Sequence, residues 1–98
     1  MSLPIVFRPD ARAEFDDAAD WYEQRQPGLC ATFTEAVDDM LDLVAAQPRM
    51  HATVYKDVRK AVVPVFPFIV LYREDQGELV VVSVFHTSRD PAEWRSRV

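Results

Sequence analysis

The sequence predicts an α+β fold in which a helical hairpin packs on one face of a mostly antiparallel four-stranded sheet. Two features of the 98 residues predict it. Apolar residues recur at helical spacing in the first half, and after Pro48 the composition changes to Val, Phe, Ile and Tyr with a period of two. The expected order of elements is β-α-α-β-β-β-α. Because this length suits one small core, residues 1–98 are expected to form a single domain.

The first half is expected to contain a short strand and two helices. Residues 4–8 are apolar and end at Pro9, a residue suited to the first turn of a helix. Residues 10–25 then form an amphipathic helix, with apolar side chains at i, i+3, i+4 and i+7 from Phe15. Trp21 lies at the border of this stripe, and we expect it in the core. A second stripe from Leu29 to Val44 predicts another helix, joined to the first by a tight turn at residues 26–28.

The second half is expected to supply three strands and a terminal helix. The candidate strands are residues 54–63, 66–73 and 79–86, and the last two are joined by a hairpin loop in which Gly77 adopts a positive φ. Tyr72 alternates in phase with apolar neighbours and is expected in the core. Residues 90–93 read Asp-Pro-Ala-Glu, a capping box that begins a short helix carrying Trp94.

Charge is divided unevenly along the chain. The net charge of −5 argues against non-specific coating of nucleic acid, which depends on many Lys and Arg side chains. Residues 10–42 hold ten acids and two bases, a balance of −8, whereas residues 49–98 hold eight bases and six acids, a balance of +2. Any anion-binding surface is therefore expected in the second half.

The sequence also indicates a cellular compartment. Its longest apolar run, residues 61–72, contains two prolines and falls short of the ~20 residues that span a bilayer. The first residues have no basic region followed by an apolar stretch, so no secretion signal is expected. Cys30 is the single cysteine, which excludes an internal disulfide, and it is expected to be buried. His51 is expected at the surface. A cytoplasmic protein without a membrane partner is the resulting expectation.

Several local phrases, taken in order, resemble the RelE/ParE superfamily of toxins from type II toxin-antitoxin modules, often described as plasmid stabilisation proteins. The resemblance runs almost from end to end. The phrases are Phe7-Arg8-Pro9-Asp10-Ala11, Trp21-Tyr22-Glu23, Pro27-Gly28-Leu29, Phe33, Val58-Arg59-Lys60-Ala61, Phe66-Pro67-Phe68-Ile69-Val70-Leu71-Tyr72, and His86-Thr87-Ser88-Arg89-Asp90-Pro91 with Trp94 and Arg97.

This resemblance implies a toxin that inhibits growth unless its cognate antitoxin binds it, in a toxin-antitoxin hetero-oligomer. The antitoxin segment would fold over the toxin as it binds. Some members of the superfamily cleave mRNA on the ribosome, and others poison DNA gyrase without cutting anything themselves. A degenerate member that binds its antitoxin but has lost toxicity is the alternative. Family membership alone does not choose among these activities.

If the chain cleaves RNA, it needs an acid, a base and fixed cations around the phosphate, and no metal. The candidate catalytic residues are Arg59, Tyr72, His86 and Arg89. His86 is the candidate base or acid, Tyr72 could donate a proton, and the arginines could hold phosphate. His86 and Arg89 also flank the capping box, so they could instead fasten the terminal helix.

If the chain binds gyrase, no catalytic group is required. The candidate target-binding residues are then Arg73, Trp94, Arg95 and Arg97. Only two lysines, Lys56 and Lys60, are present, which gives little attraction to ribosomal RNA and favours a protein target or a weakened toxin. No motif implies a cofactor. The acids of the two helices are expected to form solvated faces and no metal site, because neither helix carries a histidine.

Overall fold

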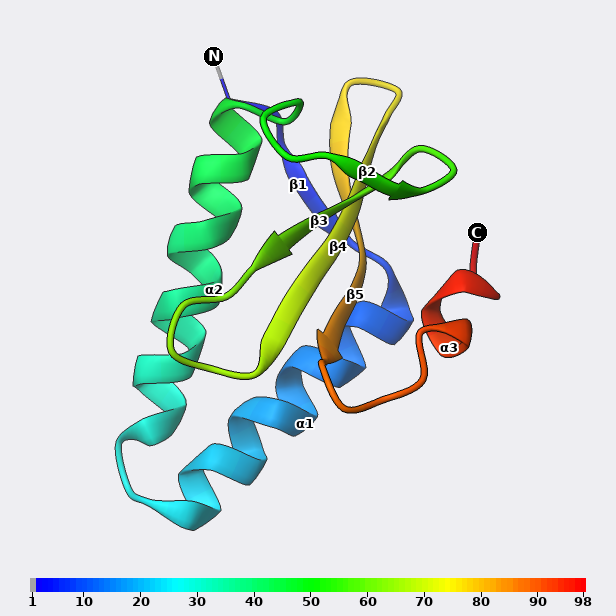
Figure 1. Ribbon diagram of the computed structural model, residues 1–98. Helices are drawn as coiled ribbons and strands as arrows, with labels where there is room; N and C mark the ends of the chain where they lie inside the picture. The colour runs from blue at the N-terminus through cyan, green and yellow to red at the C-terminus, as the bar shows by residue number, and fades with distance from the viewer. Residues whose placement is uncertain (1) are drawn as a thin grey trace.

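The computed structural model describes residues 2–98 and confirms the predicted α+β class, with a helical hairpin against a sheet (Figure 1). The elements are β1 (Ile5–Phe7), α1 (Pro9–Arg25), α2 (Leu29–Ala46), β2 (Thr53–Tyr55), β3 (Val58–Val62), β4 (Phe68–Asp75), β5 (Glu78–His86) and α3 (Ala92–Arg95). Both long helices begin and end within two residues of the predicted bounds.

The helical hairpin is closed by a turn that satisfies the start of α2. Gly28 has a φ of 89°, a left-handed conformation that costs glycine little. The Glu23 carboxylate accepts the backbone N–H groups of Gly28, at 3.1 Å, and of Cys30, at 3.1 Å. These two N–H groups have no carbonyl partner inside α2, so the Glu23 side chain of α1 caps the start of α2. Cys30 itself is only half-buried.

The sheet has five strands in the order β1-β5-β4-β3-β2, one more than the sequence predicts. The predicted strand at residues 54–63 is wrong as one element, because the chain reverses at Lys56 and Asp57. Lys56 has a φ of 52°, and β2 and β3 pair as an antiparallel hairpin around this turn. At the opposite edge, β1 pairs with β5 in parallel.

Apolar side chains cover both faces of the sheet. The face toward α1 and α2 carries the larger cluster, which includes Phe15, Tyr22, Phe33, Val37, Leu41, Val70, Tyr72, Val81 and Val84. The opposite face carries Val58, Leu71, Val82 and Phe85, and Trp94 of α3 packs on them. The terminal helix therefore lies across the sheet from the helical hairpin, and Tyr72 is buried as predicted.

The predicted capping box does not form at the start of α3, because the helix begins at Ala92 and its N-cap is Pro91, which makes no side-chain cap. The Asp90 carboxylate accepts the backbone N–H of Ala92 at 3.0 Å. Glu93, the other half of the expected capping box, instead pairs with the Arg89 guanidinium. No helix formed by residues 2–98 is long and apolar enough to cross a membrane.

Candidate functional site

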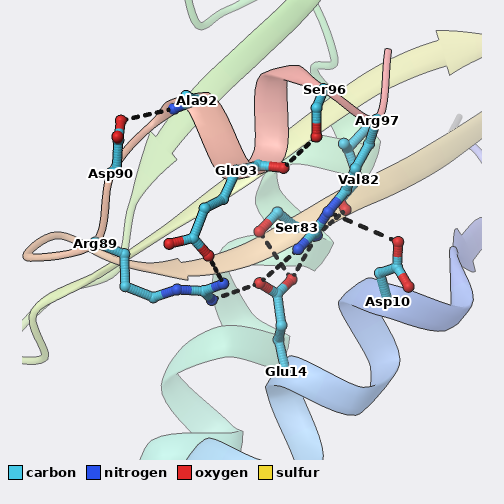
Figure 2. Close-up of polar contacts among 10 residues, drawn as sticks. All are labelled: Asp10, Glu14, Val82, Ser83, Arg89, Asp90, Ala92, Glu93, Ser96 and Arg97. Carbon is cyan, nitrogen blue, oxygen red and sulfur yellow. Dashed lines mark hydrogen bonds and ion pairs between the residues drawn. The ribbon is translucent and has the colours of Figure 1, made fainter.

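A cluster of charged side chains joins α1, β5 and the C-terminal segment around one carboxylate, Glu14 (Figure 2). The Ser83 hydroxyl donates to Glu14 Oε1 at 2.8 Å. Arg97 donates from Nη1 to Oε1 at 2.8 Å and from Nη2 to Oε2 at 3.1 Å, a bidentate pair. Arg89 donates from Nη1 to Oε2 at 2.7 Å. Glu14 thus receives hydrogen bonds from two arginines and a buried serine.

The electrostatics of this cluster keep its groups ionised. Burial alone would raise the pKa of Glu14, but hydrogen bonds from Arg97, Ser83 and Arg89 outweigh it, so the pKa lies below its ordinary value. Burial likewise works against the charged form of Arg89, yet its hydrogen bonds to Glu93 and Glu14 raise its pKa. Arg89 and Arg97 are therefore both charged, and their N–H donors are directed at protein carboxylates.

His86 lies at the end of β5, beside a pocket of about 390 Å³. Its Nδ1 accepts the backbone N–H of Ser88 at 3.0 Å, which leaves Nε2 to carry the proton of the neutral ring. The ring meets Phe68 edge to face, with centroids 5.1 Å apart. Most of the pocket wall is apolar, and its other lining residues are Ala18, Trp21, Tyr22 and Pro67.

Arg59 and Tyr72 meet at a different place, under the loop that follows α2. They are register partners on β3 and β4. The Arg59 guanidinium donates to the backbone carbonyl of His51, and the Tyr72 hydroxyl donates to the carbonyl of Pro48 at 3.1 Å. Burial raises the pKa of the Tyr72 hydroxyl. These two side chains therefore hold the loop by its backbone.

His51 belongs to the same loop and is half-buried, whereas the sequence predicted a surface residue. Its Nε2 is buried, with no hydrogen-bond partner among residues 2–98. The ring lies edge to face against Tyr72, with centroids 6.4 Å apart. The backbone of His51 fastens the loop through Arg59, a contact that no sequence pattern indicates.

The expected catalytic residues do not form one site. Tyr72 pairs with Val81, five positions before His86 on β5. At about 3.3 Å per residue, Val81 and His86 are about 16 Å apart along β5. Arg89 donates its backbone N–H to the carbonyl of His86 at 3.1 Å, but its guanidinium points to Glu14. In the structure Arg59 lies beside Tyr72. At a separate place, Arg89 and Arg97 both bind Glu14.

The expected target-binding residues are also dispersed. Trp94 is only 3% exposed, and Arg97 belongs to the Glu14 cluster. Arg73 forms an ion pair with Asp57 at 2.9 Å. Arg95 is exposed, and its guanidinium lies over the rings of Tyr55 and Trp94. Of the four, Arg95 is the most available to a partner.

Trp21 is 50% exposed, so the expectation that it packs in the core is wrong. The Arg25 guanidinium stacks on the indole, 4.4 Å from its centroid. The side chain projects from the edge of the α1 stripe, where it walls the pocket beside His86. An exposed aromatic of this kind is a typical contact residue in protein interfaces.

Sequence reasoning missed Glu14 and Ser83, although both carried a signal. Glu14 lies three residues after Ala11 and four before Ala18, so it flanks the buried stripe of α1 rather than the solvated face. Ser83 interrupts an otherwise apolar strand and is fully buried. A buried hydroxyl needs a partner, and a carboxylate at the edge of the neighbouring helix stripe supplies one.

The α+β fold, with a helical hairpin on one face of a five-stranded sheet, is that of the RelE/ParE toxin class. A family model described as the ParE toxin of the type II toxin-antitoxin system, parDE, matches residues 5–91. The chain belongs to this ParE toxin family, which confirms the resemblance drawn from the sequence.

A solved structure described as the chromosomal ParDE TA system from P. aeruginosa has the same fold, with a TM-score of 0.77. The two sequences are 14% identical, and the match covers 89% of this chain and 98% of that one. A search of curated proteins found no match.

Proposed function

We propose that this chain is a cytoplasmic toxin of the gyrase-poisoning type, which arrests growth by binding a protein target and is neutralised by an antitoxin in a hetero-oligomer. The observation that carries the proposal is that the side chains RNA cleavage would need are already bound within the chain: the Arg89 guanidinium to Glu14, and the Tyr72 hydroxyl to the Pro48 carbonyl. The proposed activity requires no cofactor and no bond cleavage by the chain itself.

Support comes first from Arg89, the candidate phosphate-binding arginine nearest to His86. Stabilising the phosphate during RNA cleavage requires donors aimed at the position where charge develops. The Arg89 guanidinium donates to Glu14 and Glu93 instead. Releasing it would leave the partly buried Glu14 carboxylate with fewer donors, which is costly.

Support comes next from Tyr72 and from the overall charge. A general acid must reach the leaving oxygen within about 3 Å, directly or through one water. The Tyr72 hydroxyl is occupied by the Pro48 carbonyl, and the whole residue is 0% exposed. A net charge of −5 also opposes association with ribosomal RNA. These features favour a protein target.

We propose that Arg95 makes the principal contact among the four target-binding candidates. Trp94, next to Arg95 in the chain, packs on the sheet and holds α3 there. Arg97 fixes the C-terminal segment through its ion pair with Glu14. Arg73, paired with Asp57, would contribute at the rim. Arginine is enriched among the residues that dominate binding energy in interfaces.

Growth after induction of the chain alone tests this proposal. Wild type, Tyr72→Phe and His86→Gln are produced at matched soluble levels, since both substitutions remove proton transfer while keeping side-chain bulk. We expect all three to arrest growth to within about twofold in viable count, because no proton is transferred. Arg95→Ala is expected to weaken arrest by about tenfold, the loss typical of one interface contact of 1–2 kcal/mol.

Two outcomes would contradict the proposal. If Tyr72→Phe or His86→Gln abolishes arrest without a change in melting temperature, the chain uses proton transfer and cleavage of mRNA becomes the better account. If wild type fails to arrest growth in its natural host, the chain is a non-toxic member of the family.

A further inference from the structure

The pocket beside His86 lies where β4 begins and β5 ends, against the second half of α1. Its volume of about 390 Å³ is in the range of sites that enclose a small organic molecule. Most of its lining residues carry aromatic rings, and the full set is Ala18, Trp21, Tyr22, Pro67, Phe68 and His86. Such walls favour a flat ring as the occupant.

The inner walls of the pocket belong to the core, and its outer wall is exposed. Tyr22 and Phe68 are each 8% exposed and are part of the larger apolar cluster. The Phe68 ring in turn meets the His86 ring edge to face. Trp21, which is 50% exposed, forms the outer wall, and the Arg25 guanidinium lies over its indole. The pocket is therefore preformed on the inside and open to an incoming group.

Two polar groups on this apolar wall have no hydrogen-bond partner among residues 2–98. The Tyr22 hydroxyl makes no such bond, although the residue is more than nine-tenths buried. Burial raises the pKa of this hydroxyl, so it keeps its proton. His86 Nδ1 accepts the Ser88 N–H, and the ring can therefore offer its Nε2–H as a donor. An occupant meets one pure donor and one hydroxyl that can donate or accept.

These two groups discriminate among ring-shaped occupants. A hydrocarbon ring would leave both of them unpaired. A carboxylate would lose its hydration to neutral donors alone, because Arg25 lies over the indole and does not line the pocket. An ammonium group would bring further donors to the His86 N–H, which cannot accept. A phenol satisfies both groups, because its hydroxyl accepts one hydrogen bond and donates another.

We propose that this pocket binds a phenol ring, whose hydroxyl accepts from His86 Nε2 and donates to the Tyr22 oxygen. The ring packs against Trp21 and Phe68. Two sources carry this group, a free phenolic molecule and a tyrosine side chain of the protein target. Binding of a phenol stands apart from the proposed function, and the second source alone rests on it. His86 thereby gains a role in which it transfers no proton.

The test follows amide and imidazole signals of the full chain by NMR while 4-methylphenol is added. Toluene, which lacks the hydroxyl, and 4-methylbenzoate, which carries a charge in its place, are the matched probes. We expect 4-methylphenol to shift the signals of Tyr22, Phe68 and His86. It should bind about three- to tenfold more tightly than toluene, the gain typical of one hydrogen bond, and more tightly than 4-methylbenzoate.

Three variants locate the recognition within the pocket. Tyr22→Phe removes the hydroxyl and keeps the ring, so it should weaken binding of 4-methylphenol about three- to tenfold and leave toluene unaffected. Ala18→Met places a longer side chain in the pocket and should abolish binding of both probes. Tyr55→Phe, on β2, is the control and should bind like wild type. Melting temperatures verify folding, and Tyr22→Phe decides the matter if Ala18→Met does not fold.

Two further measurements distinguish the sources of the phenol. If the occupant is a tyrosine of the target, N-acetyl-tyrosinamide should bind at least as tightly as 4-methylphenol, and Tyr22→Phe should weaken growth arrest. If it is a free phenolic molecule, the added amide groups should weaken binding, and Tyr22→Phe should arrest growth like wild type. Both results support the site.

Other results would overturn the proposal. Equal affinities for 4-methylphenol and toluene, or an unchanged affinity in folded Tyr22→Phe, would show that the pocket does not recognise a hydroxyl. Signal changes confined to other parts of the chain, or no saturable change, would show that the pocket is not a binding site. If wild type fails to arrest growth, the proposed function fails, and the NMR titration still decides this proposal.

Discussion

Replacing Glu14 by Gln is expected to lower the free energy of unfolding at pH 7 by about 3 kcal/mol, the lower end of the cost of removing one partner from a buried ion pair, because these pairs are only partly buried. The reason lies in the two arginines, because Arg89 and Arg97 would lose the carboxylate that holds them. In a chain of this size the change corresponds to a fall in melting temperature of roughly 12 °C or more. Thermal unfolding followed by circular dichroism measures it.

The lowered pKa of Glu14 determines how this loss of stability changes with pH. The pKa of Glu14 is lower in the folded chain than its ordinary value of about 4.3. Its ionised form therefore stabilises the fold fully above that value, and the stabilisation is lost as the pH falls through the folded pKa. The difference between wild type and Glu14→Gln should be constant near pH 7 and should shrink below about pH 4.

Asp17→Asn is the matched control, since it removes one carboxylate from the exposed face of the same helix. It should change stability by less than about 0.5 kcal/mol. Equal melting temperatures for Glu14→Gln and Asp17→Asn at pH 7 would mean that the cluster in Figure 2 does not hold the C-terminal segment.

Replacing Trp94 by Ala is the second large effect and should cost about 3–5 kcal/mol. Trp94 is the main side chain of α3 on the second apolar cluster, where it covers Leu71, Val82 and Phe85. Because small domains are stable by only about 5–15 kcal/mol, this one change could unfold a substantial fraction of the molecules. Chemical denaturation measures the loss directly.

The adjacent Arg95→Ala is the control, because the exposed guanidinium should contribute less than about 0.5 kcal/mol to stability. Trp94 and Glu14 fasten the same segment, so the double variant should lose less than the two single changes together. Strict additivity, or a loss of under 1 kcal/mol for Trp94→Ala, would show that α3 does not cover the sheet.

Much of the fold could be predicted from the sequence because its patterns are local. The spacing of Ala11, Phe15, Ala19 and Tyr22 along one helix stripe depends only on helix geometry, and those residues are buried. The parallel pairing of β1 with β5 depends instead on residues more than 70 positions apart. No local pattern encodes that pairing.

The prediction of one strand over residues 54–63 is wrong because β-forming residues lie on both sides of a turn, Val54 and Tyr55 before it and Val58 after it. Lys56 and Asp57 form the reversal between β2 and β3. Trp21 was mispredicted for a related reason. The position three residues after Ala18 lies at the border of the stripe, where helix geometry allows either burial or exposure.

The candidate site was the least predictable part. The sequence indicates which side chains could handle a phosphate, but the partner of each depends on the tertiary fold. Arg89 and Arg97 meet Glu14, which is more than 70 residues away along the chain.

Supercoiling of plasmid DNA by purified gyrase, with increasing amounts of this chain, tests the central claim most directly. We expect supercoiling to fall as the chain approaches the concentration of gyrase, and to recover when the antitoxin is added. Full supercoiling at a large excess of chain, together with cleavage of mRNA in a translating extract, would contradict the account and establish a ribosome-dependent nuclease instead.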